Sequence, residues 1–355
     1  MNNTRGFGFV LNMTKGNHRW NPWKGRAAAV GTTFGNKDIT MQLSKRLGEG
    51  GYGTVYSATL TQNRHSKTKA AIKFMQEQND ARREVFIHLA VAANPECDNA
   101  ICQMYGYFTA RVNNKRIPCL ALELMSGDLI DFMLRTTYST NVTKLQILLH
   151  IMYVAMHMIR NIRKLSNQGF YHQDIKPLNF LYKWEETSGR YRVKASDMGL
   201  ACVRDTKMIK RIKSIPKWTS KIDVGCSEIA TEGFHMPGYA GGFDVRVTDY
   251  ARTIRNDLYG ICVSIRVFAE ISGVGTKDTP DFEHLNENIE FVNDPRQVII
   301  NDLNVPGAKD AINAIHNGVN VTEYPDVNYD NLFTPIVAVV NTLMNHMGVS
   351  LVPNL

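Results

Sequence analysis

The sequence predicts an α+β protein in which a smaller, strand-rich N-terminal part precedes a larger, mostly helical C-terminal part. Two observations support this prediction. Short runs of β-branched and aromatic residues follow one another between residues 41 and 125, with one helical stretch among them. Beyond residue 126, apolar residues recur at helical spacing over longer segments. The chain has 355 residues, 44% apolar and 21% charged, which is enough for two substantial cores.

The N-terminal part is expected to contain a polar arm, a set of strands and one helix. The arm takes up residues 1–40, and strands follow it as far as Phe74. A helix is predicted over Asp80–Ala90, because its apolar residues are compatible with one buried face. Further strands then continue through Leu124. Residues 41–125 therefore form the predicted strand-rich domain.

The C-terminal part, residues 126–355, is expected to be mainly helical. One helix starts at Asp128, and a long one covers Lys144–Ser166. Between these helices and the later ones, Asn179–Tyr182 is predicted to pair with Tyr191–Val193 across a polar turn.

The segment most informative about function runs from Tyr171 to Asn179 and is followed, eighteen residues later, by Asp197. Asp174 can accept a proton from a hydroxyl group, and Lys176 can offset the charge of a phosphate. Asn179 and Asp197 supply hard oxygen ligands of the kind that magnesium prefers beside a nucleotide. A solvated loop carboxylate is the alternative for an isolated His-x-Asp, so the interpretation depends on further motifs.

A glycine motif upstream supplies that second observation. It contains Gly48, Gly50 and Gly53 and ends at Val55. Such a motif also suits a dinucleotide fold, but that fold requires a helix to begin there, whereas Thr54–Ala58 is typical of a strand. The glycines therefore predict a hairpin tip. Because glycine lacks Cβ, its backbone N–H groups can approach phosphate oxygens closely.

A lysine follows in the apolar segment Ala70–Phe74. An unpaired ammonium group is costly to bury, so Lys73 should have a carboxylate partner and an anionic ligand. We expect Glu84 to be that partner. Glu77 is too close in sequence to turn back comfortably, and Glu96 lies in a proline-containing loop.

With these motifs in this order, residues 42–272 resemble the eukaryotic-type protein kinase family. The resemblance implies a bilobal fold with a small β-rich lobe that carries one regulatory helix, and a larger helical lobe. It implies transfer of the γ-phosphate of ATP, with Mg²⁺, to protein substrates. The residues that it places in the active site are Gly48, Gly50, Gly53, Val55, Lys73, Glu84, Glu123, Met125, Asp174, Lys176, Asn179 and Asp197.

The same resemblance gives each group a role. Lys73 contacts the α- and β-phosphates, and Asp174 is the catalytic base. The segment Leu122–Met125, which includes Glu123, becomes the adenine-binding hinge, with backbone hydrogen bonds from Met125. A lysine two residues after the base, Lys176, resembles the serine/threonine branch, so serine or threonine is the expected acceptor.

Several residues depart from the family pattern. Gln173 stands where many kinases carry an arginine that binds a phosphate on the activation segment, so activity without phosphorylation of that segment is expected. Met198 replaces a phenylalanine, which is a mild apolar change. The segment His235–Phe243 lacks the family's terminal Pro-Glu pair, so its peptide-binding platform is altered. Asp257 resembles the anchor of the catalytic loop, with a helix N-cap as the alternative.

The net charge of +8 is distributed unevenly. Residues 1–26 carry +5, and residues 204–221 carry +6. The second cluster favours acidic or already phosphorylated protein substrates, although a solvated loop is an equal alternative. The arm combines its cations with Trp20 and Trp23. We expect it to dock on the protein itself, with nucleic acid or a protein partner as the alternatives.

The six cysteines show no CxxC spacing and no secretory signal precedes them, so free thiols in an intracellular compartment, cytoplasm or nucleus, are expected. The apolar segment Leu145–Ile159 is interrupted by Gln146, His150 and His157 and is therefore interpreted as a buried helix, with no membrane contact. Residues 273–355 carry no clear family motif. Within them, Pro325-Asp326 together with Tyr329–Phe333 is faintly similar to the casein-kinase-one and vaccinia-related groups.

Two classes of function remain. The chain is predicted to be an active kinase because its lysine, base and metal ligands are all present. The alternative is a pseudokinase or basic scaffold that binds nucleotide or nucleic acid without phosphoryl transfer, suggested by the altered substrate loop and the two cationic segments.

Overall fold

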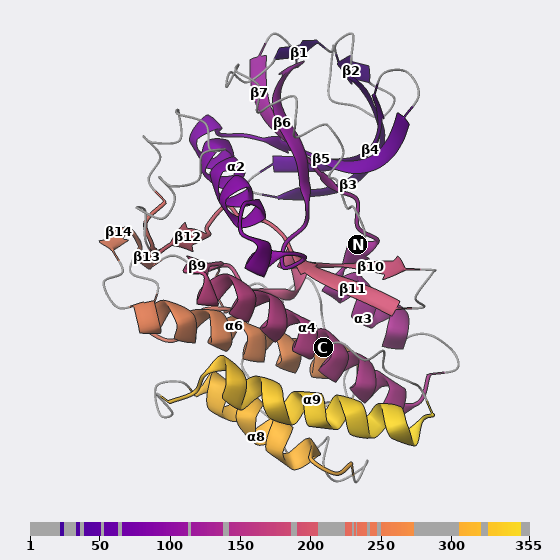
Figure 1. The fold of residues 1–355 in the computed structure, drawn as a ribbon, viewed down its shortest axis with the longest axis vertical. Coiled ribbons are helices and arrows are strands. Elements are labelled where there is room, and N and C mark those ends of the chain that lie inside the picture. The colour runs from indigo at the N-terminus through magenta and orange to yellow at the C-terminus, as the bar shows by residue number, and fades with distance from the viewer. Residues whose placement is uncertain are drawn as a thin grey trace. The chain divides into compact units, whose positions relative to one another are not determined.

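A computed structural model describes residues 22–24, 33–35, 39–50, 53–62, 66–112, 115–137, 142–185, 190–204, 224–228, 231, 233–239, 242–246, 250–272, 305–320 and 326–348. The described chain forms two compact units (Figure 1). The first contains the described residues up to Met125 together with Asp197–Gly199 and Val224. The second contains Ser126–Ser196, Leu200–Arg204 and the described residues from Gly225 on. The first is rich in strands and the second is mostly helical, which confirms the α+β prediction.

The first unit is built on one sheet in the strand order β1-β6-β7-β5-β4-β3-β2. All neighbouring strands are antiparallel except β1 and β6, which are parallel. The strands are β1 (Pro22–Lys24), β2 (Thr33–Gly35), β3 (Ile39–Gly50), β4 (Gly53–Gln62), β5 (Ser66–Met75), β6 (Met104–Val112) and β7 (Lys115–Glu123).

Two strands of the N-terminal arm lie at the two edges of this sheet. The strand β1 pairs with β6, with Trp23 opposite Ala110, and β2 pairs with β3, with Phe34 opposite Met41. β1 and β2 also contact each other, and Figure 1 shows them adjacent where the sheet curls. The expected docking of the arm on the protein itself is therefore confirmed for these two segments. The rest of the arm lies outside the described residues.

Alternation along β5 places an apolar cluster on each face of the sheet. Ala70, Ile72 and Phe74 join a buried cluster with residues of β3, β4, β6 and β7. Met75 joins a second cluster with Ala81 and residues of β6 and β7. Ala81 belongs to α2 (Gln78–Ala92), the helix predicted from the apolar face of residues 80–90. The 3-10 helix η1 (Pro95–Cys97) follows. Because side chains alternate along a strand, Lys73, which lies between Ile72 and Phe74, points toward α2.

The second unit contains five helices within the described residues. They are α3 (Leu129–Thr137), α4 (Lys144–Asn167), α6 (Tyr250–Ile271), α8 (Ala308–Val319) and α9 (Tyr329–His346). The longest, α4, begins with a capping box between Thr143 and Gln146 and packs against α6 and α9. By length and composition it is the one helix among the described residues that could cross a membrane. Because 61% of that stretch is buried inside the structure, α4 has the character of a core helix.

Short strands beside these helices hold the loops of the site. β10 (Phe180–Glu185) pairs with β11 (Arg190–Ala195), with Tyr182 opposite Val193, as the sequence predicted, and with β8 (Gly127–Asp128). The other pairs are β9 (Phe170–Tyr171) with β12 (Cys202–Val203), and β13 (Ser227–Glu228) with β14 (Gly242–Arg246). The 3-10 helix η2 (Pro177–Asn179) directly precedes β10.

The helix α6 approaches the loop between β9 and η2 very closely. A Cβ atom on Gly260 would lie 2.7 Å from the Cβ of Ile175 and 2.8 Å from its carbonyl oxygen. No side chain fits at that distance, so glycine is required at this position of the helix. This contact fixes the backbone next to Asp174.

Candidate active site

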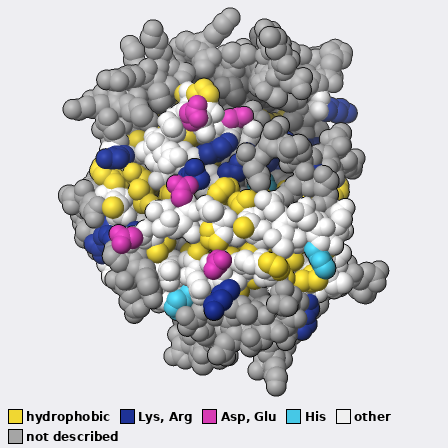
Figure 2. Space-filling view, turned by 60° about the horizontal axis from the view of Figure 1, so that its bottom comes forward, with side chains coloured by type: hydrophobic (Ala, Val, Ile, Leu, Met, Phe, Trp, Pro, Cys, Tyr) yellow, Lys and Arg dark blue, Asp and Glu magenta, His cyan; other side chains and the backbone are white. Residues whose placement is uncertain are grey.

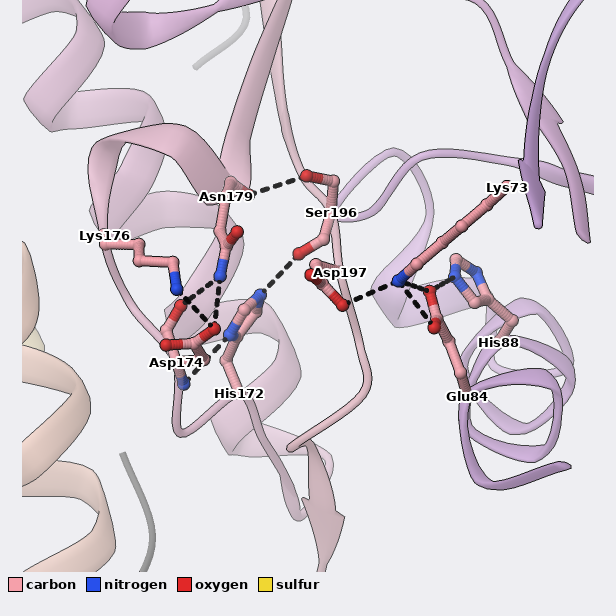
Figure 3. A network of polar contacts seen from close by, with 9 residues as sticks. All are labelled: Lys73, Glu84, His88, His172, Asp174, Lys176, Asn179, Ser196 and Asp197. Carbon is pink, nitrogen blue, oxygen red and sulfur yellow. Dashed lines mark hydrogen bonds and ion pairs between the residues drawn. The ribbon is translucent and has the colours of Figure 1, made fainter. Parts of the chain in front are cut away.

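In the first unit, Lys73 lies between two carboxylates. Its Nζ is 2.8 Å from Glu84 Oε2 and 3.1 Å from Glu84 Oε1, and it is also 2.8 Å from Asp197 Oδ1 (Figure 3). The strand β5 presents the lysine toward α2, and Glu84 lies two turns into that helix. The pairing of Lys73 with Glu84 expected from the sequence is present. Glu77 and Glu96 are both exposed.

The surroundings of this cluster change the acidity of its members. Burial by itself would lower the pKa of Lys73, but attraction by Glu84 and Asp197 outweighs burial and raises that pKa. Burial raises the pKa of Glu84 against the opposing attraction of Lys73, and Asp197 raises it further by repulsion. Both shifts are consistent with a cluster that holds two carboxylates and one ammonium group. Lys73 is therefore held as a buried cation.

His88 also belongs to this cluster, and no feature of the sequence indicated this. It lies one turn after Glu84 on α2 and is 2% exposed, with its Nε2 4.0 Å from Glu84 Oε1. Neither ring nitrogen has a hydrogen-bond partner among the residues that the structure describes. Burial, and then the charge of Lys73, lowers the pKa of His88 to about 3, so the ring is neutral. What distinguishes His88 from a solvent-exposed helical histidine is that its side chain is buried. The apolar pattern of the helix does not show this.

The glycine hairpin is present, and two of its glycines lie in different environments. The strands β3 and β4 stay paired up to Gly50 and Gly53, and the two residues between them lie outside the described chain. Gly53 has φ +148°, and a Cβ there would lie 2.0 Å from the carbonyl oxygen of Phe74. Gly48 has nothing within 4 Å of the corresponding position. Gly53 is thus required by the fold, whereas Gly48 leaves space on the strand. Val55 pairs with both Gly48 and Lys73 across the sheet.

The predicted hinge lies at the end of β7, where the first unit ends. The backbone N–H of Glu123 donates to the carbonyl oxygen of Gln103 at 2.8 Å. The N–H of Gln103 donates to Glu123 Oε2 at 3.4 Å, so the buried carboxylate has a backbone donor. Met125 is the last residue of this unit before Ser126.

In the second unit, Asp174 is held by three side chains. Its Oδ2 accepts a hydrogen bond from Asn179 Nδ2 at 2.7 Å and lies 3.1 Å from Lys176 Nζ (Figure 3). Its Oδ1 accepts a hydrogen bond from Thr231 Oγ1. Asp174 is 2% exposed. Asn179 also donates from Nδ2 to the carbonyl oxygen of Asp174 at 2.8 Å, which leaves the amide oxygen for another ligand.

Thr231 is the second residue that sequence reasoning missed. Its hydroxyl group donates to Asp174, and it accepts a hydrogen bond from Lys176 Nζ at 2.8 Å. The threonine thus bridges the carboxylate and the ammonium group. No motif surrounds it, and it is far from both partners in sequence, so only the folded chain identifies it.

Asp257 anchors the loop that carries Asp174. Its two carboxylate oxygens accept the backbone N–H groups of His172, at 3.0 Å, and Gln173, at 2.9 Å. It lies inside α6, so the anchor interpretation is confirmed and the helix N-cap alternative is wrong. Burial raises the pKa of Asp257 to about 7, against the effect of the two N–H donors. The ring of His172 bonds the carbonyl oxygen of Ser196 at 2.9 Å, which ties the same loop to the end of β11.

One sequence prediction is wrong, since two of the six cysteines are not free thiols. Cys202 and Cys226 form a disulfide with a Cα–Cα distance of 5.0 Å. The prediction failed because it rested on spacing, and these cysteines are 24 residues apart. The free cysteines are Cys97, Cys102, Cys119 and Cys262, all buried. The basic cluster predicted over residues 204–221 lies outside the described residues except for Arg204.

Comparisons with known proteins identify the family. Residues 41–220 match the protein kinase domain. The chain belongs to the protein kinase family. Mitogen-activated protein kinase 15 of Caenorhabditis elegans is 30% identical to this kinase over 202 residues, which are 55% of this chain and 37% of that protein.

Other relatives of this kinase differ in their named acceptor. Serine/threonine-protein kinase CG17528 of Drosophila melanogaster is 27% identical over 165 residues, or 46% of this chain and 20% of that protein. Tyrosine-protein kinase Mer of Mus musculus is 30% identical over 235 residues, or 59% of this chain and 22% of that protein. This kinase therefore spans less than half the length of these three relatives. Because their names include both kinds of kinase, the comparisons establish membership of the protein kinase family without fixing the acceptor residue.

Proposed function

We propose that this protein transfers the γ-phosphate of ATP to serine and threonine hydroxyl groups of proteins in a magnesium-dependent reaction. The observation that carries the proposal is the setting of Asp174. A buried carboxylate that already accepts a hydrogen bond from the hydroxyl of Thr231 has the geometry needed to accept one from a substrate hydroxyl. Lys176, 3.1 Å away, would offset negative charge on the phosphoryl group.

The Lys73 cluster supports the nucleotide side of the proposal. A buried ammonium group held by Glu84 keeps its charge and can face the α- and β-phosphates. The space at Gly48 would let the hairpin backbone approach the other phosphate oxygens. We assign the adenine to the backbone of Glu123 and Met125, and contact with the nucleotide to Val55, Gly50 and Gly53.

Magnesium fits the proposed ligands by their chemistry. The described residues contain no group of three or more His, Cys, Asp or Glu side chains suited to a metal, so a dedicated all-protein cage is absent there. Magnesium beside a nucleotide needs fewer protein ligands, because phosphate and water oxygens complete its shell. Asn179, with its amide oxygen available, and Asp197, with its carboxylate, would hold it. When bound, the ion would neutralise charge on the phosphates.

The finer points of the proposal rest on sequence features. The lysine two residues after the base favours serine and threonine over tyrosine. Gln173 favours activity without phosphorylation of the activation segment, because a neutral amide does not bind a phosphate as arginine does. The cationic residues 204–221 favour acidic or phosphorylated protein substrates. We also propose an intracellular location, although the disulfide removes the thiol argument for it.

A pseudokinase or basic scaffold is the competing proposal, and one experiment separates the two. Transfer of labelled phosphate to casein and to a basic protein would be measured for the wild type, Asp174→Ala and Lys73→Met. We expect the wild type to label at least one of them and each variant to lose more than about 99% of the activity. Equal incorporation by all three proteins would reject the assignment of these residues. No incorporation by any of them, with ATP binding retained, would favour the scaffold.

A further inference from the structure

The disulfide joins two segments that meet at the catalytic loop. Cys202 is on β12, where it pairs with Tyr171 of β9, the strand that leads into the loop of Asp174. Cys226 directly precedes β13 and stands five residues before Thr231. A covalent bond therefore links the strand beside the catalytic loop to the segment whose threonine contacts the base.

This link is buried and packed rather than exposed. Cys202 is 0% and Cys226 is 3% exposed, and they form an apolar cluster with Tyr171 and the partly buried Tyr250 and Ile254. The rings of Tyr171 and Tyr250 are stacked, with centroids 5.8 Å apart. The disulfide thus belongs to the core between α6 and the β9–β12 pair. A thiol reagent reaches it only when this cluster opens.

Gln173 adds a polar connection to the same bond. Its Nε2 lies 2.8 Å from Cys202 Sγ, and its Oε1 accepts a hydrogen bond from the hydroxyl of Tyr239 at 3.4 Å. Tyr239 is fully buried and also lies 3.4 Å from Thr253 Oγ1 on α6. Gln173, the residue before Asp174, therefore contacts both the disulfide and Tyr239 of the segment His235–Phe243.

We propose that the Cys202–Cys226 disulfide is a covalent clamp that holds the Thr231 segment against Asp174 and Lys176, so that phosphoryl transfer depends on the thiol state of this pair. The clamp acts on the side of the acceptor hydroxyl, because Thr231 contacts the base and Lys176. In the disulfide form Cys226 is joined covalently to Cys202 of the β9–β12 pair, which limits the movement of Cys226 and of the segment that follows it. With two thiols, Cys202 is still held by the pairing of β12 with β9, and Cys226 is held only through the neighbouring β13–β14 pair and its apolar packing.

The switch between the two forms is a two-electron exchange. A dithiol reductant gives two electrons and two protons to the S–S bond of the protein, which breaks to two thiols, while the dithiol closes to its own disulfide. An oxidant of the disulfide class, such as oxidised glutathione, reverses this. It takes up two electrons and two protons from the protein thiols, which join again.

The first test measures activity and thiols together on the full chain. Oxidised protein, after denaturation, should show four reactive thiols and protein reduced by dithiothreitol should show six, because four of the six cysteines are free in the structure. Reduction should lower kcat/KM for a peptide substrate about tenfold, since small displacements of positioned catalytic groups lower the rate by this much or more. The KM for ATP should stay within about twofold, because Lys73 and its carboxylates belong to the first unit and both cysteines belong to the second. An unchanged peptide kcat/KM with six free thiols would overturn the proposal.

Variants assign the effect to this pair. Cys202→Ser/Cys226→Ser should behave like the reduced wild type and should not respond to dithiothreitol. The matched control is Cys97→Ala, which removes a buried free thiol in the first unit and should respond to reduction as the wild type does. A response to dithiothreitol that persists in the double variant would place the redox effect elsewhere and reject the clamp.

A second readout needs no variant and no activity. This inference rests on the proposed function. Hydrogen exchange of residues 224–228 and Thr231 tests the clamp separately, by comparing oxidised and reduced wild-type protein. We expect faster exchange of these amides after reduction, while β4 and β5 of the first unit exchange at unchanged rates. If neither form transfers phosphate, the proposed function fails while exchange still tests the clamp. Equal exchange in the two forms would show that the bond holds nothing in place.

Discussion

Replacing His88 by leucine should change how the stability of the first unit depends on pH. In the folded chain the side chain is 2% exposed, and burial, followed by repulsion from the charge of Lys73, lowers its pKa from 6.5 to about 3. In the unfolded chain the ring takes up a proton below its ordinary pKa, while the folded chain takes one up only near pH 3. Between these two values the unfolded state binds more protons, so this histidine destabilises the fold progressively as the pH falls.

The size of the effect follows from the shift. One pKa unit corresponds to about 1.4 kcal/mol, and pH 5 lies 1.5 units below the ordinary value of 6.5. At pH 5 the buried histidine therefore lowers the free energy of unfolding by about 2 kcal/mol, whereas at pH 7.5 this effect is absent. No discount for solvent screening applies, because the side chain is 2% exposed.

Urea unfolding of the wild type, His88→Leu and His88→Gln at pH 7.5 and pH 5 would measure this. From pH 7.5 to pH 5, the free energy of unfolding of the wild type should fall by about 2 kcal/mol more than that of either variant, since neither replacement titrates. Other ionisable groups are common to the three proteins and cancel in the comparison. Leucine should also gain up to about 1 kcal/mol over glutamine at pH 7.5, because it leaves no buried polar group unsatisfied. An equal loss in all three proteins would refute the assignment of a neutral, buried His88.

Three further predictions concern the site. Gly48→Ala should leave the melting temperature within about 1 °C and raise the KM for ATP about tenfold. Gly53→Ala should instead lower the free energy of unfolding by about 2 kcal/mol or more, because its Cβ would clash with the backbone of Phe74. Normal ATP binding by Gly48→Ala would mean that the hairpin does not cover the phosphates. Asp257→Asn, measured by urea unfolding at pH 8, should cost about 2 kcal/mol, since one of two N–H donors loses its acceptor. Thr231→Val should lower kcat about tenfold with little change in the KM for ATP, and an unchanged kcat would show that the hydroxyl does not help to position Asp174.

The parts of the fold and site that the sequence predicted are those determined by short-range patterns. Alternation along β5 and the apolar face of α2 fix where Lys73 and Glu84 point, and eleven residues separate them, so their meeting follows from local structure. The pairing of β10 with β11 follows from one short turn. These predictions needed no knowledge of distant contacts.

The parts that it missed depend on contacts between distant residues. Thr231 meets Asp174 across 57 positions, and no periodicity encodes that meeting. The Cys202–Cys226 bond forms because β12 and the start of β13 are brought together by packing against α6, which cysteine spacing does not express. His88 has the same helical position as many solvent-facing histidines, so its burial required the sheet to be in place.

The strands β1 and β2 have a consequence for handling this protein. Each occupies part of an outer strand that would otherwise offer free backbone N–H and C=O groups to other molecules. A shortened version that starts after residue 38, as a minimal catalytic fragment would, uncovers β6 and β3 together. Such a fragment should self-associate as its concentration rises, so loss of solubility on trimming would reflect exposed edges and not damage to the catalytic residues.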